Sequence, residues 1–190
     1  RRVHGDRLLQ MKSSVKIFSL LLPLLLILNH VDTVEAGWQL IKEQCGVSSQ
    51  PKVCLSCVMS DPGALKADAA AISGIVVGCM RTQLGALSSN MSELARQSMD
   101  PKIVIPLHGC SFLYDQAARL LANVVPSLLK NRAFEGANRS VGLSTESIVA
   151  CIAGFNTKYT FPPNVARAMG VVDELSDAAT RILNKLSQTH

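Results

Sequence analysis

The segment Leu65–Leu94, LKADAAAISGIVVGCMRTQLGALSSNMSEL, decides the fold. Its apolar side chains recur mostly at steps of three and four residues, which predicts one long amphipathic helix with a single buried face. The helix is expected to end near Asp100-Pro101, because a residue that precedes proline disfavours the helical conformation. The members of the stripe are Leu65, Ala69, Ile72, Val76, Cys79, Leu84, Leu87, Met91 and Leu94.

Three further segments carry the same periodicity: Cys110–Leu128, Ala137–Phe155 and Val172–Leu186. Four amphipathic helices joined by short polar links predict an all-α fold, an antiparallel four-helix bundle. Pro126 lies inside the second of these helices and is expected to kink it, because proline removes a backbone hydrogen bond.

Two shorter segments, Trp38–Cys45 and Pro51–Ser60, precede the bundle and predict a short N-terminal helical hairpin. A bridge between Cys45 and Cys54 would close this hairpin. Cys110 and Cys151 lie on the inward faces of the second and third bundle helices, near ends that are neighbours in an antiparallel pair. We therefore expect two sequential disulfides, which stabilise the fold by about 2.5 and about 4 kcal/mol on the chain-entropy model.

Two alternatives are open for Cys57 and Cys79: a third disulfide, or two buried thiols. Cys54-Leu-Ser-Cys57 also has the spacing of a redox or zinc motif. Neither a second CxxC nor paired histidines complete a zinc site, and no strand precedes the motif as a redox fold requires. The sequence therefore predicts no metal site.

The beginning of the chain has the pattern of an export signal. Residues 1–10 are interpreted as translated leader and residues 11–36 as a cleavable signal peptide, with a basic start, an apolar run over Ile17–Leu28 and small residues before the cleavage site. The apolar run is shorter than the roughly 20 residues of a membrane span. The remaining domain, residues 37–190, is expected to be secreted and to have no membrane association after cleavage.

The predicted domain offers little to nucleic acid or to catalysis. It carries 14 Lys and Arg against 11 Asp and Glu, scattered without a basic run or interleaved aromatic residues, so nucleic-acid binding has no support. His108 stands near Cys110, but that cysteine is expected in a disulfide, and no GxSxG motif occurs. We expect a protein that is not an enzyme and holds no cofactor. Asn90 and Asn138 begin glycosylation sequons.

Several of these residues resemble the plant invertase inhibitor and pectin methylesterase inhibitor family, over the whole predicted domain. The likeness rests on Cys45 with Cys54, on Ser60-Asp-Pro62, on Leu107-His-Gly-Cys110 followed by Tyr114, and on Cys151-Ile-Ala-Gly-Phe155. The resemblance implies an inhibitor domain over residues 37–190, with a hairpin, a four-helix bundle and two sequential disulfides. It also implies function by occlusion: the domain would bind the active-site cleft of a cell-wall enzyme as a 1:1 complex in the apoplast, with the vacuole as the alternative location.

Two kinds of target divide the family. Invertase inhibitors carry Pro-Lys-Phe between the second and third bundle helices, where this chain has Arg132-Ala-Phe134. Only the aromatic residue is kept, so a pectin methylesterase is the expected target. A cell-wall or vacuolar acid invertase is the alternative, and a secreted helical binding module without inhibitory activity is a more distant one. The resemblance places partner binding at Lys130, Arg132 and Phe134, with Phe134 as the expected anchor.

Overall fold

A computed structural model describes residues 35–155 and 159–189. Every regular element within these ranges is a helix, which confirms the predicted all-α fold. The predicted leader and signal peptide lie outside the described residues, apart from positions 35 and 36, which belong to the first described helix, over residues 35–46.

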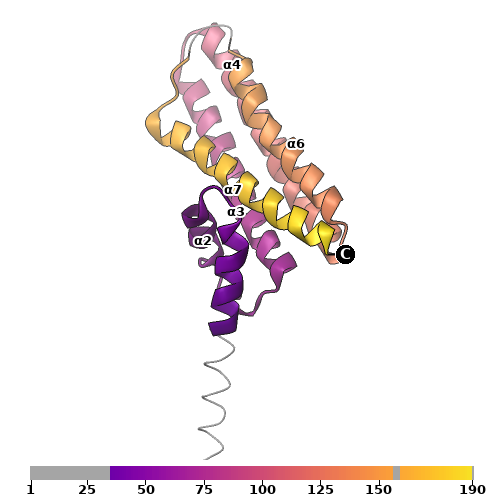
Figure 1. Cartoon of the computed structure of the whole chain (residues 1–190). Coiled ribbons are helices and arrows are strands. Elements are labelled where there is room, and N and C mark those ends of the chain that lie inside the picture. Colours follow the sequence, from indigo (N-terminus) through magenta and orange to yellow (C-terminus); the bar gives the residue numbers. More distant parts are fainter. Residues whose placement is uncertain (1–34, 156–158, 190) are drawn as a thin grey trace, which may run out of the picture.

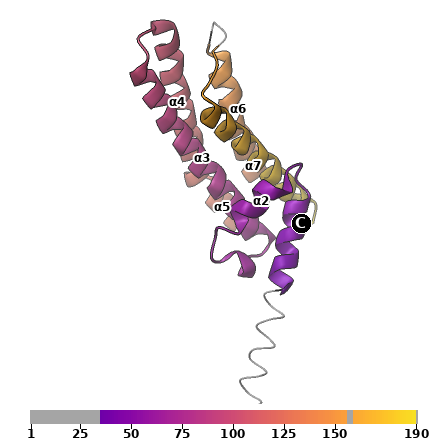
Figure 2. The ribbon, with the colours of Figure 1, turned by 90° about the vertical axis from the view of Figure 1, so that its left-hand side faces the viewer.

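Four long helices form the predicted antiparallel bundle (Figure 1): α3 (Ala69–Gln97), α4 (Pro101–Asn123), α6 (Phe134–Ala153) and α7 (Pro163–Gln188). Helix α3 packs against α4 and α7, and α6 packs against the same two helices from the opposite side. Figure 2 shows the hairpin beside the end of the bundle at which α3 begins and α7 finishes. The inward faces of all four helices meet in one continuous core.

Helix α3 follows the sequence pattern closely. Asp68 caps its first turn by accepting a hydrogen bond from the Ala71 N–H at 2.7 Å, as N-cap carboxylates do. The helix ends before Asp100-Pro101, as predicted, and only Leu65 of the stripe falls outside it, in the short 3₁₀ helix η1 (Ala64–Lys66). Among the described helices α3 alone has the length and apolar composition of a membrane span, but its apolar residues form the bundle core.

The second bundle helix differs from the prediction at both ends. Helix α4 begins at Pro101, nine residues earlier than Cys110, with the Asp100 carboxylate accepting the Lys102 N–H at 2.9 Å. It ends at Asn123, and a separate short helix, α5 (Val125–Lys130), continues the chain. The predicted kink at Pro126 is thus a break. Proline is tolerated there because it lies in the first turn of α5, where its missing N–H has no helical partner.

A tight corner joins α5 to α6; we call residues Lys130–Phe134 the α5–α6 corner. Within the described part of the chain, Arg132 is the single non-glycine residue with a positive φ, at 57°. Its N–H donates to the Leu129 carbonyl at 3.1 Å, and the Ala133 N–H donates to the Leu128 carbonyl at 2.8 Å. These two bonds make a Schellman motif, in which the left-handed position usually holds glycine. An arginine there costs about 1 kcal/mol.

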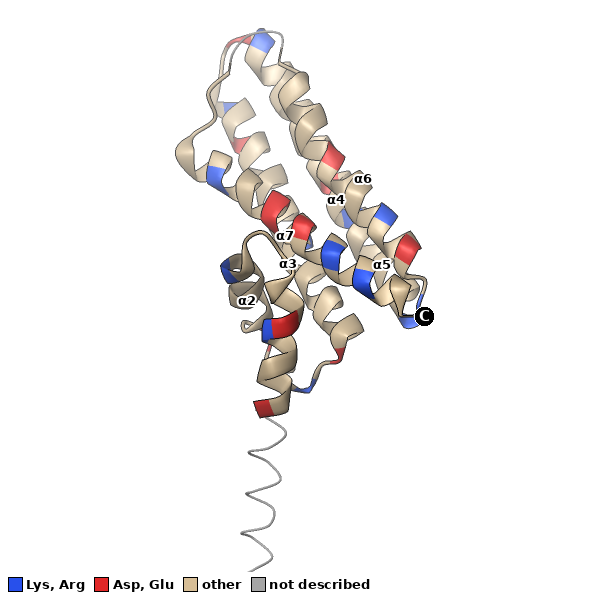
Figure 3. Ribbon diagram, viewed as in Figure 1, with Lys and Arg blue, Asp and Glu red and all other residues tan. Residues whose placement is uncertain are grey.

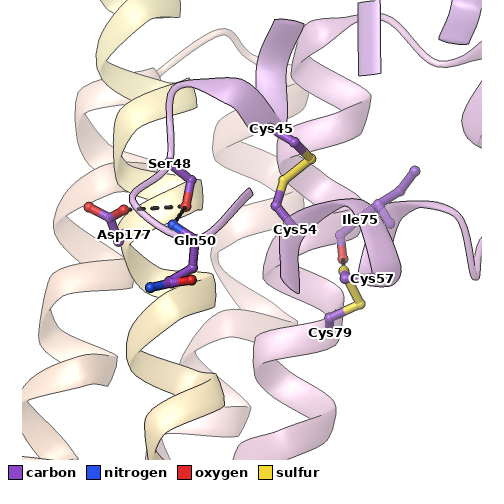
Figure 4. The surroundings of a disulfide bond; sticks show 8 residues. All are labelled: Cys45, Ser48, Gln50, Cys54, Cys57, Ile75, Cys79 and Asp177. Atoms are coloured by element: carbon purple, nitrogen blue, oxygen red, sulfur yellow. Dashed lines mark hydrogen bonds between the residues drawn. A yellow bond between two sulfur atoms is a disulfide. The ribbon is translucent and has the colours of Figure 1, made fainter. Parts of the chain in front are cut away.

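The cysteines form three sequential disulfides rather than two. Cys45–Cys54 and Cys110–Cys151 are present as predicted. The alternative left open for the other pair is also decided, because Cys57 is bonded to Cys79. This third bridge joins α2 (Pro51–Val58) of the hairpin to α3 (Figure 4). With all six cysteines paired in this way, Cys54 and Cys57 do not form the redox or zinc motif that their spacing allowed.

A second tie between hairpin and bundle is a carboxylate on α7 (Figure 4). Asp177 Oδ2 accepts from the Ser49 N–H at 2.8 Å and from the Ser49 hydroxyl at 2.9 Å, and Arg181 Nε donates to Oδ1 at 2.7 Å. Partial burial alone would raise the pKa of Asp177, but these three donors outweigh it and lower the pKa to about 2. The hairpin turn is therefore held by an ionised carboxylate.

We expect Asp177→Asn to lower the free energy of unfolding by about 1–2 kcal/mol near pH 6, a value discounted from the full pKa shift because the side chain is partly exposed. Since folding lowers the pKa of Asp177 from 3.8 to about 2, its contribution is complete above pH 3.8 and is lost as the pH falls through 2. Urea unfolding at several pH values measures this difference.

The exposed Asp173 on the same helix provides the matched control. Asp173→Asn should leave stability within about 0.5 kcal/mol of the unmodified protein. A stability difference between the Asp177 variant and the unmodified protein that stays constant from pH 6 down to pH 2 would contradict the assigned role of the carboxylate.

Candidate functional site

The residues predicted to bind a partner lie together at the α5–α6 corner. Lys130 ends α5, Arg132 holds the left-handed position, and both side chains are exposed. In Figure 3 this corner lies beside the C-terminal end of α7, where basic residues gather. The structure thus brings two cations onto one projecting turn, whose backbone is fixed by the Schellman hydrogen bonds.

Phe134, the expected anchor, is buried. Its side chain is 3% exposed and belongs to the bundle core, because it lies one helical turn before the buried Ala137 and continues the inward face of α6. Removal of this side chain is therefore expected to destabilise the fold. Its contribution to partner binding stays a prediction, now with the role of supporting the corner from beneath.

Sequence reasoning missed a second surface at the opposite end of the bundle. Four apolar side chains are exposed there, on the halves of α4 and α6 that Cys110–Cys151 joins, and we call them the distal apolar surface: Ile105, Phe112, Val149 and Ile152. Phe112 is 64% exposed. The sequence contained a signal for this exposure, because Phe112 lies two residues after the inward-facing Cys110 and therefore on nearly the opposite face of α4. The length of α6 separates this surface from the corner by roughly 27 Å.

The two sequons lie on helices of the bundle. Asn90 is half-buried in the last third of α3, and Asn138 on α6 donates a hydrogen bond to Asn184 Oδ1 at 2.8 Å. The hydroxyl of Ser140, which completes the second sequon, donates to the Gly136 carbonyl. Glycosylation at either asparagine stays a prediction.

Comparison with known proteins places this helical architecture in a family. A model of the family described as plant invertase/pectin methylesterase inhibitor matches residues 39–187, which include the hairpin and all four bundle helices. The chain belongs to this family. The match extends over both predicted disulfides and over the α5–α6 corner, so the resemblance seen in the sequence is confirmed.

Individual relatives of the family agree with this assignment. A pectinesterase inhibitor from Actinidia deliciosa is 25% identical over 176 residues, which cover 92% of this chain and 95% of that protein. A mutant form of a pectin methylesterase inhibitor from Arabidopsis has the same fold, with a TM-score of 0.61 and 15% identity over 74% of this chain and 92% of that one. A pectin methylesterase inhibitor from Arabidopsis thaliana gives a TM-score of 0.57 at 15% identity, over 77% of this chain and 95% of that one.

Proposed function

We propose that this protein inhibits a plant cell-wall pectin methylesterase by binding over the active-site cleft of the enzyme. The observation that carries the proposal is the alignment with the Actinidia inhibitor along 95% of that protein's length. The bundle itself performs no chemistry under this proposal. Its rigid, disulfide-tied helices present a surface that excludes pectin from the cleft.

The proposal places the protein outside the cell, in the apoplast. Three disulfides within the described residues favour an oxidising compartment, since the cytosol keeps thiols reduced. The predicted signal peptide over residues 11–36 supports the same location.

The α5–α6 corner is the proposed contact with the enzyme, in a 1:1 complex. Lys130 and Arg132 project from it, and Phe134 packs beneath it. Arg132 supports the proposal because a strained residue persists where function compensates for its cost in stability. The Pro-Lys pair of invertase inhibitors is replaced by Arg132-Ala133, which favours pectin methylesterase over invertase as the target.

The deciding experiment titrates the purified mature domain against a pectin methylesterase and an acid invertase at pH 5–6. We expect loss of pectin methylesterase activity with an end point at one inhibitor per enzyme, and unchanged invertase activity. Inhibition of invertase alone would transfer the function to the other branch of the family. Inhibition of neither enzyme, tested over several isoforms, would leave a binding module without inhibitory activity.

Replacing Arg132 by glycine should change stability and inhibition in opposite directions. Glycine adopts the left-handed conformation without the steric cost, so Arg132→Gly is expected to raise the free energy of unfolding by about 1 kcal/mol. Loss of the guanidinium at the interface should weaken inhibition about tenfold or more. Denaturant unfolding and the inhibition constant measure the two effects.

Two controls locate the effect. Arg132→Lys keeps the positive charge and the strained backbone, so its stability and inhibition should remain near those of the unmodified protein. Phe112→Ser tests the distal apolar surface instead. Full inhibition by Arg132→Gly together with loss of inhibition by Phe112→Ser would move the enzyme contact to that end of the bundle.

A further inference from the structure

A groove of about 430 Å³ lies between the beginning of α3 and α5. We call it the α3–α5 groove. One wall comes from α3 and the other from α5, and the last turn of α4 contributes to its floor. The residues that matter below are Gly74, Gly78 and Arg81 on α3, and Val125, Leu129 and Lys130 on α5.

Two glycines keep the groove open. A Cβ atom at Gly74 would come within 3.3 Å of Leu129 Cδ1, so the absence of a side chain there lets α5 approach α3 closely. A Cβ atom at Gly78, one turn further along, would meet nothing within 4 Å. Close packing thus explains why position 74 is glycine. It does not explain glycine at position 78, where glycine weakens the helix interior without relieving any contact. Gly78 leaves space that the fold itself does not fill.

The charged side chains that line the groove itself have one sign. Arg81 and Lys130 stand on opposite walls with exposed side chains, and neither forms a salt bridge with any described residue. No Asp or Glu belongs to the residues that line this groove. An adjoining hollow shares Ala71, Gly74, Gly78 and Arg81 with the groove. Asp61 lines that hollow, and its carboxylate accepts the Gly63 N–H at 2.7 Å. The groove therefore attracts a carboxylate.

The floor is apolar and closely packed. Val77, Leu121 and Val125 form it, and each is at most 4% exposed. Because so little apolar surface of the floor is accessible, a free small molecule would bury little area there and bind weakly. A side chain of a protein already held at the α5–α6 corner loses much less translational freedom when it enters the groove. Lys130 belongs to both the corner and the groove, so one partner can occupy both.

We propose that the α3–α5 groove receives a segment of the pectin methylesterase in which a carboxylate side chain stands next to a bulky apolar one. The apolar side chain fills the space above Gly78, and the carboxylate lies between Arg81 and Lys130. This inference rests on the proposed function and extends its interface from the corner onto α3. It assigns a binding role to Arg81 and Gly78, which the family motifs did not indicate.

Filling the groove tests the proposal without disturbing the fold. Gly78→Leu adds a side chain where nothing lies within 4 Å of the new Cβ atom, and leucine favours the helix, so the melting temperature should not fall. We expect its inhibition constant for a pectin methylesterase to rise about tenfold or more. Gly85→Leu is the matched control, because Gly85 lies two turns further along α3, equally unobstructed and outside the groove.

A charge variant tests the second half of the proposal. Arg81→Gln should weaken binding about fivefold or more and reduce its dependence on salt, because one ion pair with the enzyme is lost. Arg167→Gln on α7, an exposed cation outside the groove, should do neither.

The outcomes separate the two proposals. If the unmodified protein inhibits the enzyme and Gly78→Leu inhibits it equally well, the groove is not part of the interface and the proposed function stands. If Gly85→Leu loses as much inhibition as Gly78→Leu, the contact is a broad face of α3 and the groove proposal is overturned. If the unmodified protein inhibits no pectin methylesterase, the proposed function falls, and the enzyme as occupant of the groove falls with it.

Discussion

Replacing Cys110 and Cys151 together by alanine is expected to lower the free energy of unfolding by about 4 kcal/mol. The bridge closes a loop of 41 residues, and most of its effect comes from the conformations that it removes from the unfolded chain. It also joins the first half of α4 to the last turn of α6, in the half of the bundle far from the hairpin. Urea unfolding of the purified double variant, with the other two bridges intact, measures the loss.

The other two bridges provide internal controls. Cys45–Cys54 closes 9 residues and Cys57–Cys79 closes 22, so the corresponding double alanine variants should lose about 2.5 and about 3.5 kcal/mol. The order of the three losses is the prediction. Equal losses, or the largest loss for the shortest loop, would show that native contacts of the cysteines outweigh loop entropy.

Replacing Phe134 by alanine should lower the free energy of unfolding by about 3–4 kcal/mol, because truncating a buried phenylalanine removes its hydrophobic contribution and leaves a cavity. The effect on inhibition should follow from that loss: less of the protein is folded, while each folded molecule still presents Lys130 and Arg132. Denaturant unfolding gives the stability, and an inhibition curve corrected for the folded fraction gives the affinity.

Phe112→Ala removes the same side chain from an exposed position on α4 and is the control. Its stability should change by less than about 0.5 kcal/mol. A Phe134→Ala protein that unfolds at the same urea concentration as the unmodified chain would contradict the burial described above and restore Phe134 as an exposed anchor.

The bundle could be predicted from the sequence because apolar residues at steps of three and four mark one buried face on each long helix. Where that spacing fails, so did the prediction. The first nine residues of α4 include the consecutive apolar residues Ile103, Val104 and Ile105, of which Ile105 is 71% exposed, so no periodic face marks the start of the helix. The break at Val124 was expected only as a kink, because the sequence does not reveal whether the chain resumes helical bonding after a proline.

The disulfides and the candidate binding sites also differ in how well the sequence predicted them. The bridge Cys110–Cys151 could be predicted because both cysteines lie on inward faces of helices that must be neighbours. The bridge Cys57–Cys79 could not, because it depends on how the hairpin packs on α3. Phe134 could have been recognised as buried, since it precedes Ala137 by one turn. The α3–α5 groove has no signal in the linear sequence, because it arises only where α5 packs beside Gly74 and Gly78 of α3.

The order of the three disulfides has a consequence for how the chain would acquire them under the proposed export from the cell. Each cysteine is bonded to the next one along the chain, first with second, third with fourth and fifth with sixth. When a chain crosses a membrane from its amino end, the native partner of each unpaired cysteine is therefore the next cysteine to emerge. Pairing in the order of emergence gives the native connectivity among the fifteen that six cysteines allow. Helix α7, which carries Asp177, follows the last cysteine in the chain, so under the proposed export all six cysteines would emerge before the helix that holds the hairpin turn.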